Sequence, residues 1–215
     1  FSFIMNTISK DLDINKNIRG FEFSESSRHL SNQIDKSDVD CLVETASNNY
    51  SEICHRYYKY KAKFFSGKKL NYWDRNAPYP KQKEFKINWN EAKSIVVNAY
   101  SEFDDRFGKI ANLFFENSWI HATVKKGKTS GAFSHPTVPS CHPCILINYQ
   151  GKIRDVMTLA HELGHGIHQY LANKNGVLLA DTPLTLAETA SVFGEMLTFC
   201  LLYTSDAADE SSGGV

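Results

Sequence analysis

The chain has 215 residues, enough for one sizeable hydrophobic core or for one part of a larger protein. Lysine and arginine together number 24, as do aspartate and glutamate, so the zero net charge favours neither nucleic acid nor an anionic membrane as a partner. The longest apolar runs fall well short of ~18 residues, so we expect no membrane span.

Two features of the sequence bear on where the protein works. The first residues, FSFIMNTISKDLDINKN, have no initiator methionine and no signal-peptide pattern, so we expect the sequence to begin within a longer protein. The cysteines are odd in number and mostly scattered: Cys41, Cys54, Cys141, Cys144 and Cys200. This usage predicts thiols in a cytoplasmic protein rather than a disulfide framework.

Residues 1–69 are predicted to be helical, with a turn near Gly20. Apolar residues recur there with helical spacing. Ser37, three residues before Asp40, predicts a helix start. The lysines that alternate with tyrosine and phenylalanine from Lys59 to Lys69 are interpreted as a solvated helix face whose lysine stems cover apolar surface.

Residues 70–118 are predicted to form an extended connector followed by a helical stretch. Pro78 and Pro80 indicate that Leu70–Pro80 is extended. Residues 89–118 return to helix, with Asn88 or Asn90 as the N-cap. Apolar side chains recur there at intervals of three and four, and the expected core positions are Ile95, Val96, Ala99, Phe103, Phe107, Ile110, Leu113 and Phe114.

The pattern changes from helix to strand at Trp119. Residues 119–135 have the composition of a strand, a turn at Lys126–Lys128, and a second short strand around Ala132 and Phe133. The apolar run Cys144–Tyr149 predicts a further strand that Gln150 and Gly151 close. We therefore expect a small sheet, whose unpaired edge could accept an extended peptide as an extra strand.

Cys141 and Cys144 form a C-x-x-C pattern just before the third predicted strand. A structural zinc site needs two more ligands at matching spacing, and the sequence has no second C-x-x-C. A redox motif has a strand before it and a helix that begins at it, whereas here a strand follows. We therefore assign these thiols no function.

The next helix, predicted from Lys152 to about Asn173, contains His-Glu-Leu-Gly-His, which matches the H-E-x-x-H pattern of zinc peptidases. Helical residues advance by ~100° and ~1.5 Å each, so His161 and His165 lie one turn apart on nearly the same face. Both imidazoles can therefore reach one metal ion. Glu162 lies beside that face, where it can touch a water on the metal without being a ligand. The pattern predicts a zinc site with Glu162 as general base.

The surroundings of the motif favour a metal site over two histidines that are merely hydrogen-bonded in a core helix. The residues around the motif from Thr158 to Ile167 are uncharged, which is unusual for a solvated helix. The longer H-E-x-x-H-x-x-G-x-x-H pattern fails because it needs glycine at His168 and histidine at Leu171. His168 shares the face but lies ~10.5 Å along the axis from His161, too far to bind the same ion.

A second helix is predicted after Asp181-Thr182-Pro183, a cap followed by proline in the first turn. Glu188 and Glu195 lie two turns apart on it, among apolar residues. Carboxylates in such a setting are costly to bury unless they are paired or bind a metal. Glu188 is predicted as the third ligand because the loop after His165 is long enough to reverse direction. Glu195 is predicted to support a ligand or the local structure rather than to bind the metal.

The chain resembles the thimet-oligopeptidase-like family of zinc peptidases, and most closely its oligoendopeptidase F branch. The segments that carry the resemblance occur in order between residues 70 and 200: LNYWDRNAP, GKTSGAFS, ILINY, TLAHELGHGIHQYL and TLAETASVFGEML. The chain departs from the branch at Cys144, where an aromatic residue is usual after His-Pro.

The resemblance implies a zincin-like catalytic domain, mainly α with a small sheet beside the active-site helix, and a deep channel that admits short peptides. It implies one Zn²⁺ held by His161, His165 and Glu188, with Glu162 as the base. The GKTSGAFS loop and the ILINY strand would lie along the substrate. The substrate-binding residues would then be Gly131, Ala132, Phe133, Ile147, Asn148 and Tyr149, and the residues behind the ligands would be Glu195 and His168.

Three segments are expected on this basis. Residues 1–69 would be a helical part of the peptidase lobe, and residues 70–202 the zinc-binding core, incomplete at its C-terminal end. Residues 203–215 lose apolar periodicity, so we expect a non-native or disordered tail. Family members continue through a helical segment whose His and Tyr residues bind substrate and stabilise the oxyanion. A chain without that segment is expected to bind zinc weakly and to hydrolyse peptides poorly.

The expected function is that of a zinc metalloendopeptidase acting on short oligopeptides in the cytoplasm, with no nucleic-acid or membrane partner. The alternative is a catalytically silent helical fragment or interaction protein whose histidines belong to its core. Stoichiometric zinc in a purified, untagged sample would distinguish the two. The sequence indicates neither the peptide preference nor the oligomeric state.

Overall fold

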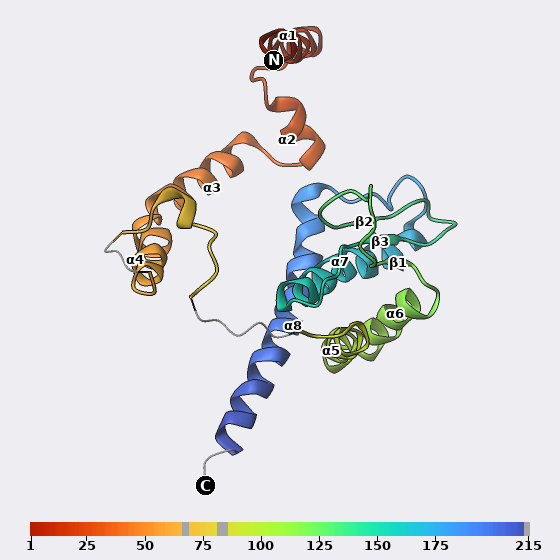
Figure 1. Cartoon of the computed structure of the whole chain (residues 1–215). Coiled ribbons are helices and arrows are strands. Elements are labelled where there is room, and N and C mark those ends of the chain that lie inside the picture. The colour runs from red at the N-terminus through yellow and green to blue at the C-terminus, as the bar shows by residue number, and fades with distance from the viewer. Residues whose placement is uncertain (66–68, 81–85, 213–215) are drawn as a thin grey trace. The chain divides into compact units, whose positions relative to one another are not determined.

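The computed structural model describes residues 1–65, 69–80 and 86–212 (Figure 1). The chain divides into two compact units, Phe1–Lys83 and Glu84–Val215. The sequence analysis drew a boundary near residue 69 instead. The connector after that residue groups with the first unit because Lys61 Nζ donates to the Arg75 carbonyl at 2.8 Å and the Phe64 and Tyr79 rings meet edge to face.

The first unit is helical, as the sequence predicted. Its elements are α1 (Ser2–Arg19), α2 (Ser26–Asn32), α3 (Lys36–Asn48), the π-helix η1 (Ser51–His55), α4 (Arg56–Ala62) and the 3₁₀ turn η2 (Tyr72–Asp74). Gly20 ends α1 in the left-handed conformation with φ 67°, so the predicted turn is confirmed. The helix start predicted at Ser37 was wrong. Asp35 is the N-cap of α3 and forms a capping box with Asp38.

Lys61 corrects the interpretation of the lysine-rich stretch as a solvated face. This side chain is buried, and its ammonium group donates to the Arg75 carbonyl. It also lies over the rings of Phe65 and Tyr79, 5.8 and 5.7 Å from their centroids. The hydrogen bond and the two cation–π contacts offset the cost of burying the charge. Alternation of lysine and aromatic residues alone could not separate this buried lysine from its exposed neighbours.

The second unit is mainly helical with one small sheet, which confirms the predicted fold class. Its elements are α5 (Trp89–Phe103), α6 (Asp105–Glu116), β1 (Ile120–His121), β2 (Phe133–His135), β3 (Cys144–Leu146), α7 (Ile153–Ala172), the 3₁₀ turn η3 (Asn173–Asn175) and α8 (Leu184–Ser212). The strand order is β1-β3-β2, with β1 parallel and β2 antiparallel to β3. Strand β2 therefore forms one edge of the sheet.

The helical stretch predicted for residues 89–118 is two helices, because the chain is extended at Asp104, with φ −158° and ψ 126°. The Asp104 carboxylate accepts from the Arg106 backbone N–H and pairs with its guanidinium, which lowers the pKa of Asp104 to about 2. Asn88 caps α5, as predicted, by accepting from Glu91 N–H. Phe103, expected in the core, is 53% exposed because it precedes the break.

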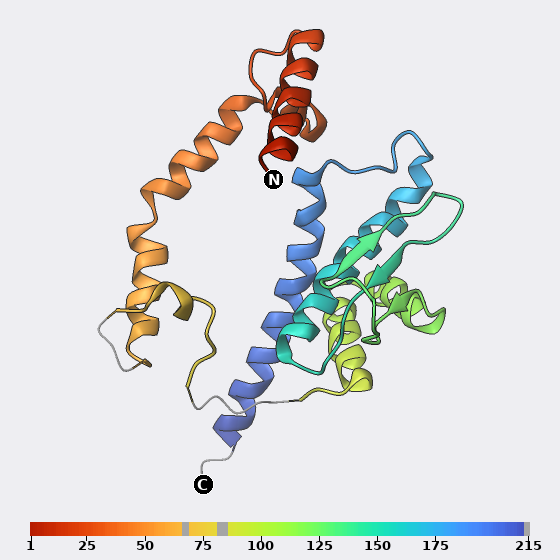
Figure 2. The ribbon, with the colours of Figure 1, turned by 45° about the horizontal axis from the view of Figure 1, so that its top comes forward.

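Helix α7 lies at the centre of this unit, with α8 along one side and the sheet against another (Figures 1 and 2). Its Val156, Leu159 and Leu163 side chains are fully buried. Tyr100 of α5 is buried against it and donates its hydroxyl to the Ala160 carbonyl at 2.9 Å. Burial raises the pKa of Tyr100, so this hydroxyl stays protonated as a donor. The backbone just before His161 is therefore tied to α5.

Gly164 sets how closely α7 and α8 approach each other. A Cβ atom at this position would lie 2.5 Å from the Ala190 carbonyl oxygen and 2.8 Å from the Ser191 Cα. Both neighbours are backbone atoms of α8, so neither could move without moving the helix. The glycine within His-Glu-Leu-Gly-His thus lets the helix that carries Glu188 reach the histidines.

We expect Gly164→Ala to destabilise the protein by ~1–3 kcal/mol, because the added methyl group overpacks the helix crossing. It should also weaken zinc binding, since α8 must shift and carry Glu188 with it. Denaturant unfolding and a chelator-competition zinc titration would measure the two effects. Gly108→Ala is the comparison, because its methyl group would meet Ser101 of α5 rather than the backbone of α8. Loss of stability with unchanged zinc affinity in Gly164→Ala would contradict the proposed role.

Helix α8 continues to Ser212, past Leu202, where the sequence analysis expected regular structure to end. No glycine or proline occurs between Leu202 and Gly213, and the alanine and acidic residues of that segment are compatible with a helix. By length and hydropathy, Leu184–Leu202 is the one helix in the described residues that could cross a membrane. A single helix of this kind indicates little, because core helices of soluble proteins pass the same test. The expectation of no membrane partner stays a prediction.

Candidate metal centre

Three side chains from two helices converge where α7 crosses α8. His161 and His165 lie one turn apart on α7, and Glu188 lies in the second turn of α8. Glu188 Oε2 is 3.4 Å from His161 Nε2 and 3.5 Å from His165 Nε2. Among the described residues, these three form the one group of potential ligands whose donor atoms all lie within 4.8 Å of one another.

The spacing of these atoms fits a tetrahedral ion better than a direct hydrogen bond. Zinc holds nitrogen and carboxylate oxygen at ~2.0–2.2 Å, and two tetrahedral ligands at that distance are ~3.3–3.5 Å apart. An N–H···O hydrogen bond is shorter, ~2.7–3.2 Å. The two oxygen–nitrogen distances of 3.4 and 3.5 Å fall in the first range. The Glu188 side chain is 51% exposed, so the group is open to solvent on one side.

Each candidate ligand is oriented by a further partner. Glu195 Oε2 lies 3.2 Å from His161 Nδ1, on the opposite side of the imidazole from Glu188. His165 makes a hydrogen bond to the backbone of Ala187, and burial lowers the pKa of His165, which favours the neutral ring that a metal requires. Glu188 Oε2 accepts from the buried Ser191 hydroxyl at 2.9 Å. Carboxylate and backbone partners of this kind fix the tautomer and direction of ligating imidazoles.

Glu162 lies beside the three candidate ligands and is only 7% exposed. Burial raises the pKa of Glu162, and the nearby Glu188 raises it further, whereas His161 lowers it. The Ser134 backbone N–H also lowers this pKa by donating a hydrogen bond to the carboxylate. A carboxylate with a raised pKa is a stronger base, which suits the role of a general base.

Strand β2 is fastened to α7 at Ser134. Besides the hydrogen bond to Glu162, the Ser134 hydroxyl donates to Gln169 Oε1 at 2.8 Å. Gln169 Nε2 in turn donates to the Ser134 carbonyl at 3.3 Å. The edge strand of the sheet is therefore held next to the candidate base, a connection that the sequence analysis did not predict.

His168 lies near the three candidate ligands but outside the group. It lines a pocket of about 120 Å³ with His165, Gln169 and residues of the loop before α8. The sequence analysis excluded His168 as a ligand because it lies too far along the helix from His161. The placement of His168 agrees with that exclusion. Cys141 and Cys144 are free and exposed, and neither belongs to the group of potential ligands.

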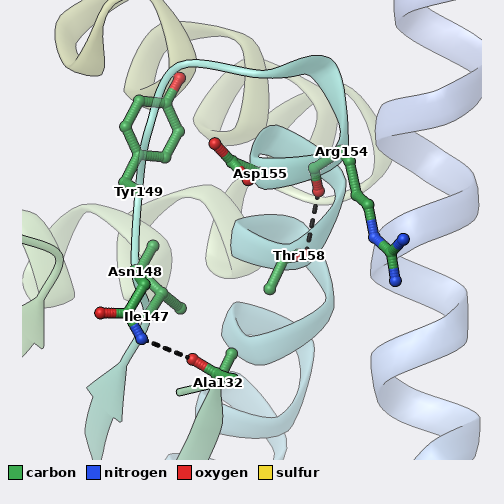
Figure 3. Close-up of a pocket in the computed structure, with 8 residues that line it drawn as sticks. Ala132, Ile147, Asn148, Tyr149, Arg154, Asp155 and Thr158 are labelled. Carbon is green, nitrogen blue, oxygen red and sulfur yellow. Dashed lines mark hydrogen bonds between the residues drawn. The ribbon is translucent and has the colours of Figure 1, made fainter. Parts of the chain in front are cut away.

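A larger pocket, of about 320 Å³, lies beside the N-terminal half of α7 (Figure 3). Its lining includes five of the six residues predicted to lie along a substrate: Gly131, Ala132, Ile147, Asn148 and Tyr149. The sixth, Phe133, is not part of the lining and is 47% exposed.

Three further residues line the pocket: Arg154, Asp155 and Thr158. The sequence analysis did not single them out as site residues. They lie one to two turns before His161 on α7, so helical periodicity from the motif could have indicated them.

A histidine pair on one helix, faced by a glutamate from the next helix beside a small sheet, defines a zincin-like fold. The chain belongs to peptidase family M3, whose family model matches residues 2–212. This membership confirms the predicted resemblance.

Individual relatives agree with the family. Oligopeptidase PepF of Bacillus subtilis is 26% identical over 195 residues, which are 90% of this chain and 29% of that protein. An oligoendopeptidase F homolog of Borreliella burgdorferi is 31% identical over 182 residues, 83% of this chain and 30% of that protein. The chain thus spans about 30% of the length of these curated relatives.

Solved structures share the fold. A structure described as an oligoendopeptidase F from Bacillus anthracis str. Ames superposes with a TM-score of 0.79 and 18% identity. The match covers 94% of this chain and 38% of that one.

Proposed function

We propose that these residues form part of a zinc metallopeptidase that hydrolyses peptide bonds in short oligopeptides. The observation that carries the proposal is the placement of Glu188 Oε2 at 3.4 and 3.5 Å from the two histidine Nε2 atoms, which suits one tetrahedral ion. Membership of peptidase family M3 and similarity to proteins named oligopeptidases support the substrate class. The proposed location is the cytoplasm, in keeping with the free thiols of Cys141 and Cys144.

Each residue of the candidate site has a separate role in the proposed reaction. His161, His165 and Glu188 would hold the ion, which when bound lowers the pKa of a water and polarises the scissile carbonyl. Glu162 removes the proton from the attacking water and passes it to the leaving amine. Glu195 keeps the Nε2 of His161 directed at the ion by bonding to Nδ1. The pocket lined by Gly131, Ala132, Ile147, Asn148 and Tyr149 would contact the peptide.

Metal content and hydrolysis test this proposal together. We expect untagged protein extended to the length of its relatives to contain about one zinc per chain and to cleave a quenched-fluorescence nonapeptide, with activity lost to a chelator and restored by Zn²⁺, whereas these 215 residues alone should bind zinc weakly and hydrolyse the peptide poorly. Protein that binds no stoichiometric zinc and cleaves no peptide would be a catalytically silent helical protein, and the proposal would be wrong.

A further inference from the structure

We propose that Gln169 is a positioning residue for Glu162. Its side chain holds Ser134 of β2 against α7, and the Ser134 backbone in turn holds the Glu162 carboxylate. Gln169 would thus act through Ser134 rather than on the substrate or the metal. This inference rests on the proposed function, because Glu162 is the base of that reaction.

The register of the sheet explains why the Ser134 backbone is available to α7. Ser134 pairs with Ile145 of β3. The Ile145 N–H donates to the Trp119 carbonyl at 2.9 Å, so the backbone polar groups of Ile145 face the β1 side of the sheet. Ser134 and Ile145 therefore share no hydrogen bond, and the N–H and C=O of Ser134 both point away from β3. Helix α7, which lies beside β2 (Figure 2), supplies a partner for each of them.

Gln169 bonds to Ser134 through both ends of its side-chain amide. Its Oε1 accepts from the Ser134 hydroxyl at 2.8 Å, and its Nε2 donates to the Ser134 carbonyl at 3.3 Å. An amide offers an acceptor and a donor side by side, which neither a carboxylate nor an apolar side chain does. The two bonds together hold the Ser134 residue at one position relative to α7.

Glu162 lies on the same face of α7 as Gln169. The two residues are seven positions apart in the sequence, which is about two turns, or ~10.5 Å along the axis. Ser134 bonds to both, because its carbonyl accepts from Gln169 and its N–H donates to the Glu162 carboxylate. The N–H and C=O of one strand residue move together. Loss of the bonds to Gln169 would therefore also disturb the bond to Glu162.

The Glu162 carboxylate has few other restraints. Within the described residues, the Ser134 N–H is the one hydrogen-bond donor found for it, and His161 and Glu188 act on it through their charges. A glutamate side chain has several rotatable bonds, so a carboxylate without this donor would sample more than one position. The bond from Ser134 selects one of them. The outward backbone groups of Ser134 therefore serve Glu162 and are not open for pairing with a peptide.

Hydrolysis by protein extended to the length of its relatives tests the role of Gln169. Gln169→Met keeps the approximate shape of the side chain and removes both bonds to Ser134. We expect kcat to fall by ~10-fold or more, and KM and zinc affinity to change by less than ~2-fold, because a misplaced base affects the chemical step. In a Glu162→Gln background the same substitution should cause no further loss, since the group that it positions is already gone. A loss of equal size in both backgrounds would overturn the inference.

Ser134 offers a matched pair of variants. Ser134→Thr keeps the hydroxyl that donates to Gln169, whereas Ser134→Val has nearly the same shape as that variant without the hydroxyl. We expect a lower kcat for Ser134→Val than for Ser134→Thr, and Ser134→Val combined with Gln169→Met should be no slower than Gln169→Met alone. Equal kcat values for the Thr and Val variants would contradict the proposed contact.

Asn173→Leu is the control for Gln169→Met. It removes a side-chain amide that donates to the Cys141 carbonyl at 3.4 Å, between β2 and β3, and does not touch Ser134. Its kcat should equal that of the unmodified protein. A loss as large as that of Gln169→Met would show a general effect of loosening this segment and would overturn the specific role of Gln169.

A second measurement requires no hydrolysis. Hydrogen–deuterium exchange at the Ser134 amide of metal-free protein, read by mass spectrometry, reports the hydrogen bond to Glu162. We expect exchange to be ~3–10-fold faster in Gln169→Met and unchanged in Asn173→Leu. Unchanged exchange in Gln169→Met would overturn the inference even if activity fell. Extended protein that neither binds zinc nor cleaves peptides would instead refute the proposed function, and exchange at Ser134 would still report the contact with Gln169.

Discussion

Glu162→Gln should reduce peptide hydrolysis by ~10²–10⁴-fold while the protein keeps its zinc. The substitution preserves the shape of the side chain and leaves an amide oxygen that can still accept from the Ser134 backbone N–H. It removes the group that takes the proton from the attacking water. The three candidate ligands lie on other side chains, so metal content measured by mass spectrometry should not change.

Glu116→Gln is the matched control for this experiment, because it neutralises an exposed carboxylate at the end of α6, outside the metal group. Its hydrolysis rate should equal that of the unmodified protein. If Glu162→Gln lost zinc along with activity, Glu162 would have a structural role at the site rather than the role of base.

Glu188→Ala should weaken zinc binding by more than ~100-fold, and His161→Ala and His165→Ala should do the same. Residues behind the ligands of a metal site typically contribute ~10–100-fold, so loss of a ligand should exceed that range and loss of Glu195 should fall within it. A chelator-competition titration, with circular dichroism to check folding, would measure all four variants.

His168→Ala is the control for the ligand series, because this histidine lies on the same helix but outside the group of potential ligands. We expect its zinc affinity to change by less than ~10-fold. Equal losses for His168→Ala and Glu188→Ala would show that the third ligand has been chosen wrongly.

Local sequence patterns predicted the main helices of the second unit correctly. The H-E-x-x-H spacing, the predicted helix from Lys152 and the cap before Leu184 all depend on residues close together in sequence, and the structure has both helices where they were expected. The Glu195 contact with His161 joins residues that are 34 positions apart. The sequence analysis still predicted a supporting role for Glu195, because an acid on an apolar helix needs a partner.

Other features depended on contacts that one sequence does not show. The break at Asp104 follows from a hydrogen bond between its side chain and Arg106 that competes with helix continuation, and the apolar spacing on either side gave no sign of it. The burial of Lys61 requires Arg75 and Tyr79, which follow it by more than ten residues. Helical periodicity could have indicated Arg154, but the pocket that it lines is formed with segments that the sequence does not bring together.

The two acids of α8 contact the same imidazole from opposite sides. Glu188 faces Nε2 of His161 and Glu195 faces Nδ1, and both acids belong to one continuous helix. A slide of α8 by a single residue, or a rotation about its axis, would remove both contacts in one movement. The candidate ligand and the group that orients His161 therefore both depend on the position of one helix. Any displacement of α8 along α7, ~1.5 Å for each residue, would therefore change the metal ligand and the orientation of His161 together.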